Sequence, residues 1–290
     1  MTAQDKIDEQ AARSSRADTQ LATMVKGATP AIARRLPRFL ATEGKAEQMA
    51  AIALDTVMQS AALRRCSAQS IVRGIMLASE YGLAIDGVQG HAYLVPYKVK
   101  GVETAQFQIG YRGLVELMYR TEAWESVNAD VVTASDAFDF EQGTTPFLKH
   151  KRALERRGAP GGKSEGGTRI AAYAIAYPKG GGVPTFVVLS EEDVLEHRRA
   201  SKAYAYNPGE SIWKKYPDVA WCKSALRELS KTVAMATDKS ALLRKAAVMD
   251  ERSEKEPEIV DAEIVAEEPQ PPSDEPPPGE AIDWETGKKV

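Results

Sequence analysis

The sequence predicts an α+β fold, with N-terminal helices, then a mainly antiparallel sheet with helices packed on one face, and a disordered acidic C-terminal tail. Three observations predict it. Apolar residues recur at helical spacing as far as Gly82. Between residues 91 and 190, short apolar segments of alternating character are separated by glycine-containing turns. A long helical pattern then runs from Ile212 to about Ala236.

Charge and composition divide the chain into three parts. Of 41 acidic and 38 basic residues, 14 and 4 lie in residues 250–290, which leaves 27 and 34 for the rest. Because that last segment is also proline-rich, we expect residues 250–290 to be a disordered tail that docks a partner or competes for the basic surface. Residues 1–29 are polar and predict a flexible or weakly helical arm. The folded core is expected over residues 30–249.

The core is expected to begin with helices. Residues 32–40 carry apolar side chains at helical spacing, and Pro37 ends or kinks that helix. A second amphipathic segment covers residues 49–58. A third helix is predicted to begin after the N-cap residue Ser67 and to stop at Gly82. We expect these helices to be packing elements rather than parts of a functional site.

A strand that turns sharply into a helix lies at the centre of the sequence. Apolar and polar residues alternate through Gln106–Ile109, and from Leu114 the spacing becomes helical. Gly110 and Gly113 bracket the change, where an unusual torsion or a close approach is required. Residues 91–99 form the preceding strand, so the two strands predict a hairpin that feeds a helix.

Tyr111 and Arg112 therefore occupy a rigid corner of the predicted fold. A guanidinium held beside an aromatic ring is suited to a phosphate or a base plane. A structural ion pair with a nearby carboxylate is the alternative for Arg112. The alternation of the strand also leaves open whether Tyr111 faces a ligand or the core.

Further strands and a basic loop follow. Strands are predicted over the segments Trp124–Thr133, Ala137–Glu141, Arg169–Tyr177 and Val183–Leu189. Residues 149–169 are first basic and then glycine-rich. Gly162-Lys163-Ser164 is not a phosphate-binding loop, because Arg157 stands where that motif requires glycine. The loop is expected either to lie on a polyanion or to be solvated.

The long C-terminal helical pattern carries an apolar stripe. Its members are Cys222, Leu226, Leu229 and Val233. Trp213 lies near the start, and Pro217 is compatible with a helix only in its first turn.

Cations run beside that stripe, at Lys223, Arg227 and Lys231. Like charges at this spacing repel by a few tenths of a kcal/mol per pair, so a polyanion lying along them would offset the repulsion. The alternative is a solvated face on which Asp218 and Glu228 act as counter-ions.

Three blocks together resemble RecT-family phage recombinases, which are single-strand DNA annealing proteins. They are Gly87–Pro96, Gln106–Gly113 and Trp213–Lys231, and the likeness in element order covers roughly residues 30–250. The chain departs from the family at Arg227-Glu228, where members often carry two basic residues, and at Cys222-Lys223, where they carry a lysine pair. The resemblance implies ATP-independent annealing of single-stranded DNA, in an oligomeric ring or helical filament. It also implies a phage 5′→3′ exonuclease and the host single-strand DNA-binding protein as partners.

The predicted function requires no covalent catalysis, cofactor or metal, so the protein is expected not to be an enzyme. The residues predicted to bind DNA are Lys98, Tyr111, Arg112, Lys149, Arg152, Lys214, Lys223, Arg227 and Lys231. Two aromatic residues, Tyr97 and Trp213, are predicted to stack on or wedge beside bases.

Two other functions remain open at this stage. A metal-dependent nuclease would require clustered carboxylates, and Asp130, Asp136 and Asp139 form the only close group in the sheet region. A protein-binding adaptor of a phage DNA-processing complex would rely on the acidic tail alone. Cys66 and Cys222 lie far apart and suggest neither a zinc site nor a disulfide, so a cytoplasmic location is expected.

Overall fold

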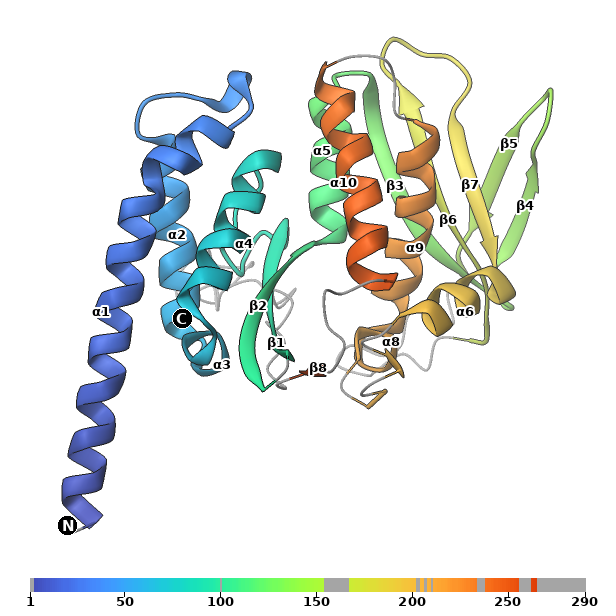
Figure 1. The fold of residues 1–290 in the computed structure, drawn as a ribbon. Helices are drawn as coiled ribbons and strands as arrows, with labels where there is room; N and C mark the ends of the chain where they lie inside the picture. The colour runs from blue at the N-terminus through green and yellow to red at the C-terminus, as the bar shows by residue number, and fades with distance from the viewer. Residues whose placement is uncertain are drawn as a thin grey trace, which may run out of the picture.

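The computed structural model describes residues 3–99, 101–153, 167–201, 204–205, 208–209, 211–233, 238–255 and 262–264. Its helices and antiparallel strands confirm the α+β class, with N-terminal helices on one side of the molecule and a helix-covered sheet on the other (Figure 1). None of the described helices combines the length and apolar character needed to cross a bilayer. The predicted glycine-rich loop falls on residues 154–166, outside the described residues.

Four helices and one short 3-10 turn form the N-terminal part. They are α1 (Ala3–Arg35), η1 (Arg38–Leu40), α2 (Lys45–Gln59), α3 (Ala61–Arg65) and α4 (Ala68–Tyr81). The boundary expected at residue 29 lies inside α1, and Pro30 is within that helix. Leu21, Val25 and Ile32 are buried from one face of α1, so a few apolar contacts dock a segment whose composition is mostly polar.

The caps of α4 are as predicted. The Ser67 hydroxyl accepts a hydrogen bond from the Ser70 amide at 3.4 Å. Gly82 closes the helix in the left-handed conformation, with φ of 61°. Pro37 lies two residues beyond Arg35, the last residue of α1, which confirms its expected role as a helix terminator.

The first sheet lies against α4. Its strands β1 (Ala92–Val99) and β2 (Val102–Ile109) form the predicted antiparallel hairpin, and β8 (Ala262–Ile264) pairs with the other edge of β1. Ala105, Phe107 and Ile109 of β2 are buried while the intervening glutamines are half-buried, as the alternation predicted.

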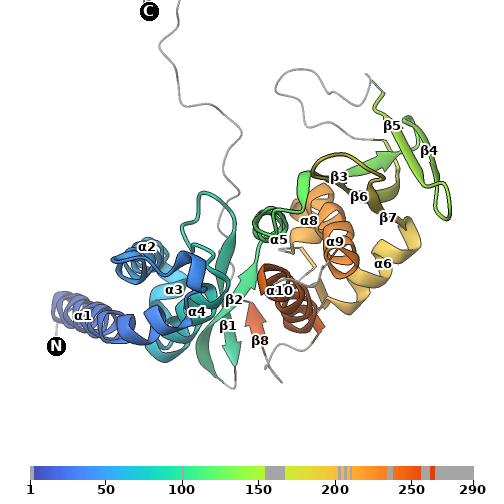
Figure 2. The same cartoon turned by 90° about the horizontal axis from the view of Figure 1, so that it is seen from above.

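The second sheet has the strand order β3-β6-β7, all antiparallel. Its strands are β3 (Trp124–Thr133), β6 (Arg169–Pro178) and β7 (Thr185–Ser190). A separate hairpin of β4 (Ala137–Glu141) and β5 (Phe147–Lys151) projects beyond the end of this sheet, at the far side from α1 (Figures 1 and 2). The predicted strand at residues 183–189 begins slightly later, at Thr185.

Helices pack on this sheet and on one another. They are α5 (Tyr111–Arg120), α6 (Glu191–Ala200), α8 (Ile212–Lys215), α9 (Pro217–Thr232) and α10 (Asp238–Lys255). Helices α5, α6 and α9 contact the strands, and α10 packs against α5 and α9 (Figures 1 and 2).

Two expectations about the C-terminal region need correction. The single helix expected over residues 212–236 is two helices, because the chain leaves helical geometry at Tyr216 and Pro217 starts α9. Helix α10 also continues beyond residue 249, and Asp250 is 1% exposed. The remainder of the predicted acidic tail, apart from the three residues of β8, lies outside the described residues.

Candidate nucleic-acid interface

The strand-to-helix corner is fixed by close backbone approaches. A Cβ atom on Gly110 would lie 2.0 Å from the carbonyl oxygen of Gly90, and one on Gly113 would lie 2.1 Å from that of His91. The Gly110 amide donates to the His91 carbonyl at 3.0 Å. Both glycines are therefore required for close approach, and the loop before β1 locks the first turn of α5 in place.

Tyr111 is the first residue of α5, and its ring is half-buried against the core. Its hydroxyl accepts a hydrogen bond from Arg112 Nε at 3.2 Å, and the Arg112 guanidinium lies 5.9 Å from the centre of the ring. The tyrosine thus serves both as packing and as a platform that orients the arginine. Strand alternation left open whether Tyr111 faces a ligand or the core; its ring packs against the core and also lines the groove described next.

A groove of about 900 Å³ opens beside this corner. Helix α5, strand β3 and the first turns of α9 line it, and residues on either side of the segment 154–166 complete its wall. The charged and tyrosine side chains that line it include Tyr111, Arg112, Tyr119, Asp130, Arg152, Arg169 and Asp218. An open, partly aromatic groove of this volume can hold part of an extended polymer backbone.

Two of the groove arginines are held by carboxylates. Arg152 Nε donates to Asp130 Oδ2 at 2.6 Å, and Arg169 Nε donates to Asp218 Oδ1 at 2.5 Å. Arg152 was predicted from the sequence, whereas Arg169 was not. Arg169 stands alone at the start of a strand, and its partner is 49 residues away, so no local pattern indicates the pair.

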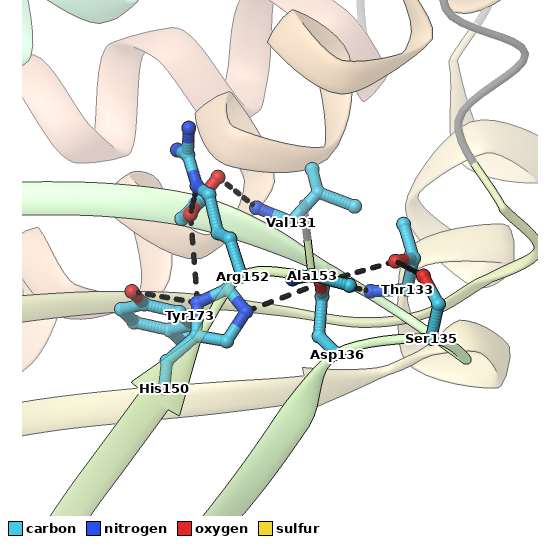
Figure 3. Close-up of polar contacts among 9 residues, drawn as sticks. Val131, Thr133, Ser135, Asp136, His150, Arg152, Ala153 and Tyr173 are labelled. Atoms are coloured by element: carbon cyan, nitrogen blue, oxygen red, sulfur yellow. Dashed lines mark hydrogen bonds and ion pairs between the residues drawn. The ribbon is translucent and has the colours of Figure 1, made fainter. Parts of the chain in front are cut away.

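A buried cluster anchors Asp130 and the root of the β4–β5 hairpin (Figure 3). His150 Nδ1 lies 3.2 Å from the Tyr173 hydroxyl and 3.5 Å from Asp130 Oδ2, and its Nε2 lies 3.3 Å from Asp136 Oδ2. Burial raises the pKa of Tyr173 to about 12, so its hydroxyl keeps its proton at neutral pH. The cluster holds Arg152 at the groove by fixing the strand end that precedes it.

Two of the three carboxylates suggested for a nuclease, Asp130 and Asp136, make structural contacts. Asp136 accepts hydrogen bonds from the Thr133 amide, the Thr133 hydroxyl and the Ala153 amide. Burial opposes ionisation of Asp136, but these hydrogen bonds outweigh it and hold its pKa well below the usual range. Asp139 is exposed on β4. In the described part of the chain, no three His, Cys, Asp or Glu side chains are grouped to hold a metal ion.

The cations of α9 have a different environment from the one expected. Arg227 is 4% exposed, and its guanidinium contacts Asp250 Oδ2 through Nε at 2.8 Å and Nη2 at 2.7 Å. Lys223 Nζ lies 3.0 Å from Asp250 Oδ1. Asp250 comes from α10, so a residue expected in the tail pairs with two of the three cations. Arg227 does not face the groove, and its burial argues for a structural role.

The remaining predicted residues are dispersed. Lys231 pairs with Glu228 at 2.9 Å and Glu251 at 3.0 Å. Lys98 is half-buried on β1, opposite Glu103 in the strand register. Lys149 is exposed on β5 and Lys214 is exposed on α8, and neither lines the groove.

The two aromatic residues proposed to contact bases are not in the groove. Tyr97 is 6% exposed, and its hydroxyl accepts a hydrogen bond from Gln108 Nε2 at 2.8 Å. Trp213 is half-buried and packs against the core. Tyr119, which the sequence did not single out, is 40% exposed and lines the same groove as Arg112.

This chain is similar to known proteins over most of its length. A model of the RecT family matches residues 47–263. Over 234 residues the chain is 32% identical to Protein RecT of Escherichia coli (strain K12), which covers 79% of this chain and 78% of that protein. It is also 32% identical over 100 residues to the uncharacterized protein YqaK of Bacillus subtilis (strain 168), covering 34% of this chain and 33% of that protein. The matched region includes the corner, the groove and both helices that flank it.

Proposed function

Because the chain belongs to the RecT family of DNA recombination and annealing proteins, we propose that it anneals complementary single strands bound in the groove beside Tyr111 and Arg112. The observation that carries this proposal is the convergence of Arg112, Arg152 and Arg169 on one open groove. These arginines come from three separate parts of the chain, and their common position is a property of the fold.

The chemistry of the groove suits a nucleic-acid backbone. A guanidinium presents several donors in a plane and can contact two phosphate oxygens at once. Tyr119 offers an exposed ring, and stacking on an aromatic face does not depend on base identity. Binding should therefore fall steeply with salt and depend little on sequence.

The proposed mechanism is physical rather than covalent. Cations that neutralise one backbone reduce its repulsion of a second, so two strands can approach while their bases pair. Base pairing then supplies the sequence specificity, and the protein supplies geometry. No proton transfer, nucleophile or bound nucleotide enters this scheme, so we propose a protein without enzymatic activity.

Self-association belongs to the proposal in the form of a ring or helical filament. Successive grooves along an assembly would multiply the affinity of each, because the second contact of a tethered strand is intramolecular. A phage 5′→3′ exonuclease and the host single-strand DNA-binding protein are the partners we propose, with the acidic segment as one docking region. These partners would deliver and cover the single strand on which the groove acts.

The decisive experiment measures annealing of two complementary labelled oligonucleotides in EDTA without nucleotide. We expect the protein to accelerate annealing under these conditions. A requirement for ATP or a divalent metal would refute the mechanism. Absence of acceleration together with binding to other proteins would favour the adaptor.

A variant pair tests the site. Arg112→Ala should weaken single-strand binding and reduce the magnitude of the salt slope by about 0.7, the value for one phosphate contact. Arg34→Ala, which removes an exposed arginine from α1, should leave both unchanged. If Arg112→Ala instead unfolds the protein and leaves the affinity of its folded fraction intact, Arg112 is a structural residue.

A further inference from the structure

We propose that Asp218 is a carboxylate placeholder for DNA: it holds Arg169 in the empty groove and is replaced by a phosphate when a single strand binds. This inference rests on the proposed function and adds a regulatory residue to the same site. Nothing in the similarity to known proteins assigns a role to Asp218 or to its partner.

The Arg169–Asp218 ion pair is placed where a phosphate can displace the carboxylate. Arg169 begins β6 and Asp218 is the second residue of α9, so the contact spans two walls of the groove. The side chains are 31% and 59% exposed, and Arg169 Nε lies 2.5 Å from Asp218 Oδ1. An ion pair with this much solvent access changes a folding or binding equilibrium by about fivefold or less. A phosphate with several anionic oxygens can therefore compete for the guanidinium.

The position of Asp218 at the start of a helix lowers the free energy needed to separate it from Arg169. Asp218 lies in the first turn of α9, where exposed backbone amides favour negative charge. When Arg169 turns to a phosphate, the carboxylate keeps this stabilisation and remains close enough to recapture the arginine.

The other clamped arginine is less easily released. Asp130, which holds Arg152, also accepts the Val131 amide at 2.9 Å and belongs to the His150 cluster. Asp130 is thus fixed from three sides, and its removal would disturb the hairpin root. Asp218 is the carboxylate that can be changed without disturbing that cluster.

A competing carboxylate has a consequence for annealing. A strand that is gripped by every cation would be held in one register, whereas pairing requires it to shift until complementary bases meet. By recapturing Arg169, Asp218 would speed the release of individual phosphates. The residue would therefore lower affinity and raise strand mobility at the same time.

The test is a double-mutant cycle of Asp218→Asn and Arg169→Gln, read by fluorescence anisotropy of labelled oligodeoxythymidine at several salt concentrations. We expect Asp218→Asn to tighten binding by about two- to fivefold and to slow dissociation. We expect Arg169→Gln to weaken binding and to reduce the salt slope by about 0.7. The double variant should bind like Arg169→Gln alone, because the carboxylate acts through the arginine.

Two outcomes would overturn the inference. A gain that persists in the Arg169→Gln background would mean that Asp218 acts only by general repulsion of DNA. Weaker binding by Asp218→Asn, with an unchanged thermal midpoint, would mean that the carboxylate positions Arg169 for DNA rather than competing with it. Asp55→Asn on α2 makes the same change in net charge away from the groove and should have no effect. Failure of the wild-type protein to bind would count against the proposed function itself, which separates the two failures.

Discussion

The strongest test of the architecture concerns Arg227, which the sequence pattern predicted as a DNA contact and the structure buries against Asp250. We consider Arg227→Met, because methionine retains apolar volume while removing the charge. The substitution removes both guanidinium contacts with a carboxylate whose side chain is fully buried. Breaking one partner of a buried ion pair typically costs about 3–5 kcal/mol. Since Lys223 still neutralises Asp250, we expect a loss near the lower end, about 3 kcal/mol.

Urea denaturation followed by tryptophan fluorescence measures this loss, since Trp221 is buried in the same helix. All variants should be compared at one protein concentration, because self-association adds to apparent stability. Lys231→Met is the matched control on α9, where a side chain that is 34% exposed should contribute less than about 1 kcal/mol. In conditions where Arg227→Met is folded, its affinity for single-stranded DNA should equal that of the wild type. A loss of stability below about 1 kcal/mol combined with weaker DNA binding would refute the structural role.

Three further predictions test separate features. Gly113→Ala should destabilise the protein by several kcal/mol or prevent folding, because its Cβ would lie 2.1 Å from a backbone oxygen. Gly27→Ala is the control in the interior of α1: its Cβ would meet nothing within 4 Å, so it should stabilise the protein by about 0.5–1 kcal/mol in thermal denaturation. Tyr97→Phe should lower the free energy of unfolding in urea by about 0.5–1.5 kcal/mol, because the hydrogen bond with Gln108 is lost, and should leave DNA affinity unchanged. Weaker DNA binding by this variant would support Tyr97 as a base contact. Truncation after Lys255 removes β8 but keeps Asp250, so it should lower the melting temperature less than truncation after Met249, which also removes this buried carboxylate. Equal midpoints for the two truncations would contradict this role of α10.

Local pattern was a good guide wherever the determining contacts are local. The change of period at Gly110 and the caps at Ser67 and Gly82 depend on neighbouring residues, and the structure has them as predicted. The position of Pro217 in the first turn of a helix was likewise a local requirement. Such features can be predicted because backbone torsion and capping act over three or four residues.

The environment of the charged residues could not be predicted in the same way. Periodicity placed Lys223 and Arg227 beside the apolar stripe of α9, but it carries no information about which element covers that flank. The covering residue is Asp250, 23 positions beyond Arg227 and within a segment whose composition indicated a disordered tail. The run of cations on α9 therefore suggested ligand binding, although two of these cations pair with a carboxylate of helix α10.

In the groove the situation is the opposite, because no run of cations in the sequence indicates it. Its arginines are far apart in the chain, and the folding of the sheet brings them together. Three arginines and three carboxylates line it, so its formal charge is balanced. Two of these carboxylates hold groove arginines, and the third, Glu116, accepts a hydrogen bond from Arg120 at 2.9 Å. A polyanion can enter a balanced groove only if some carboxylates release their cations while others stay neutralised by partners of their own. Glu116 and Asp130 meet the second condition and Asp218 meets the first, so weakening the exposed Arg169–Asp218 pair should raise the affinity for a polyanion without any added arginine.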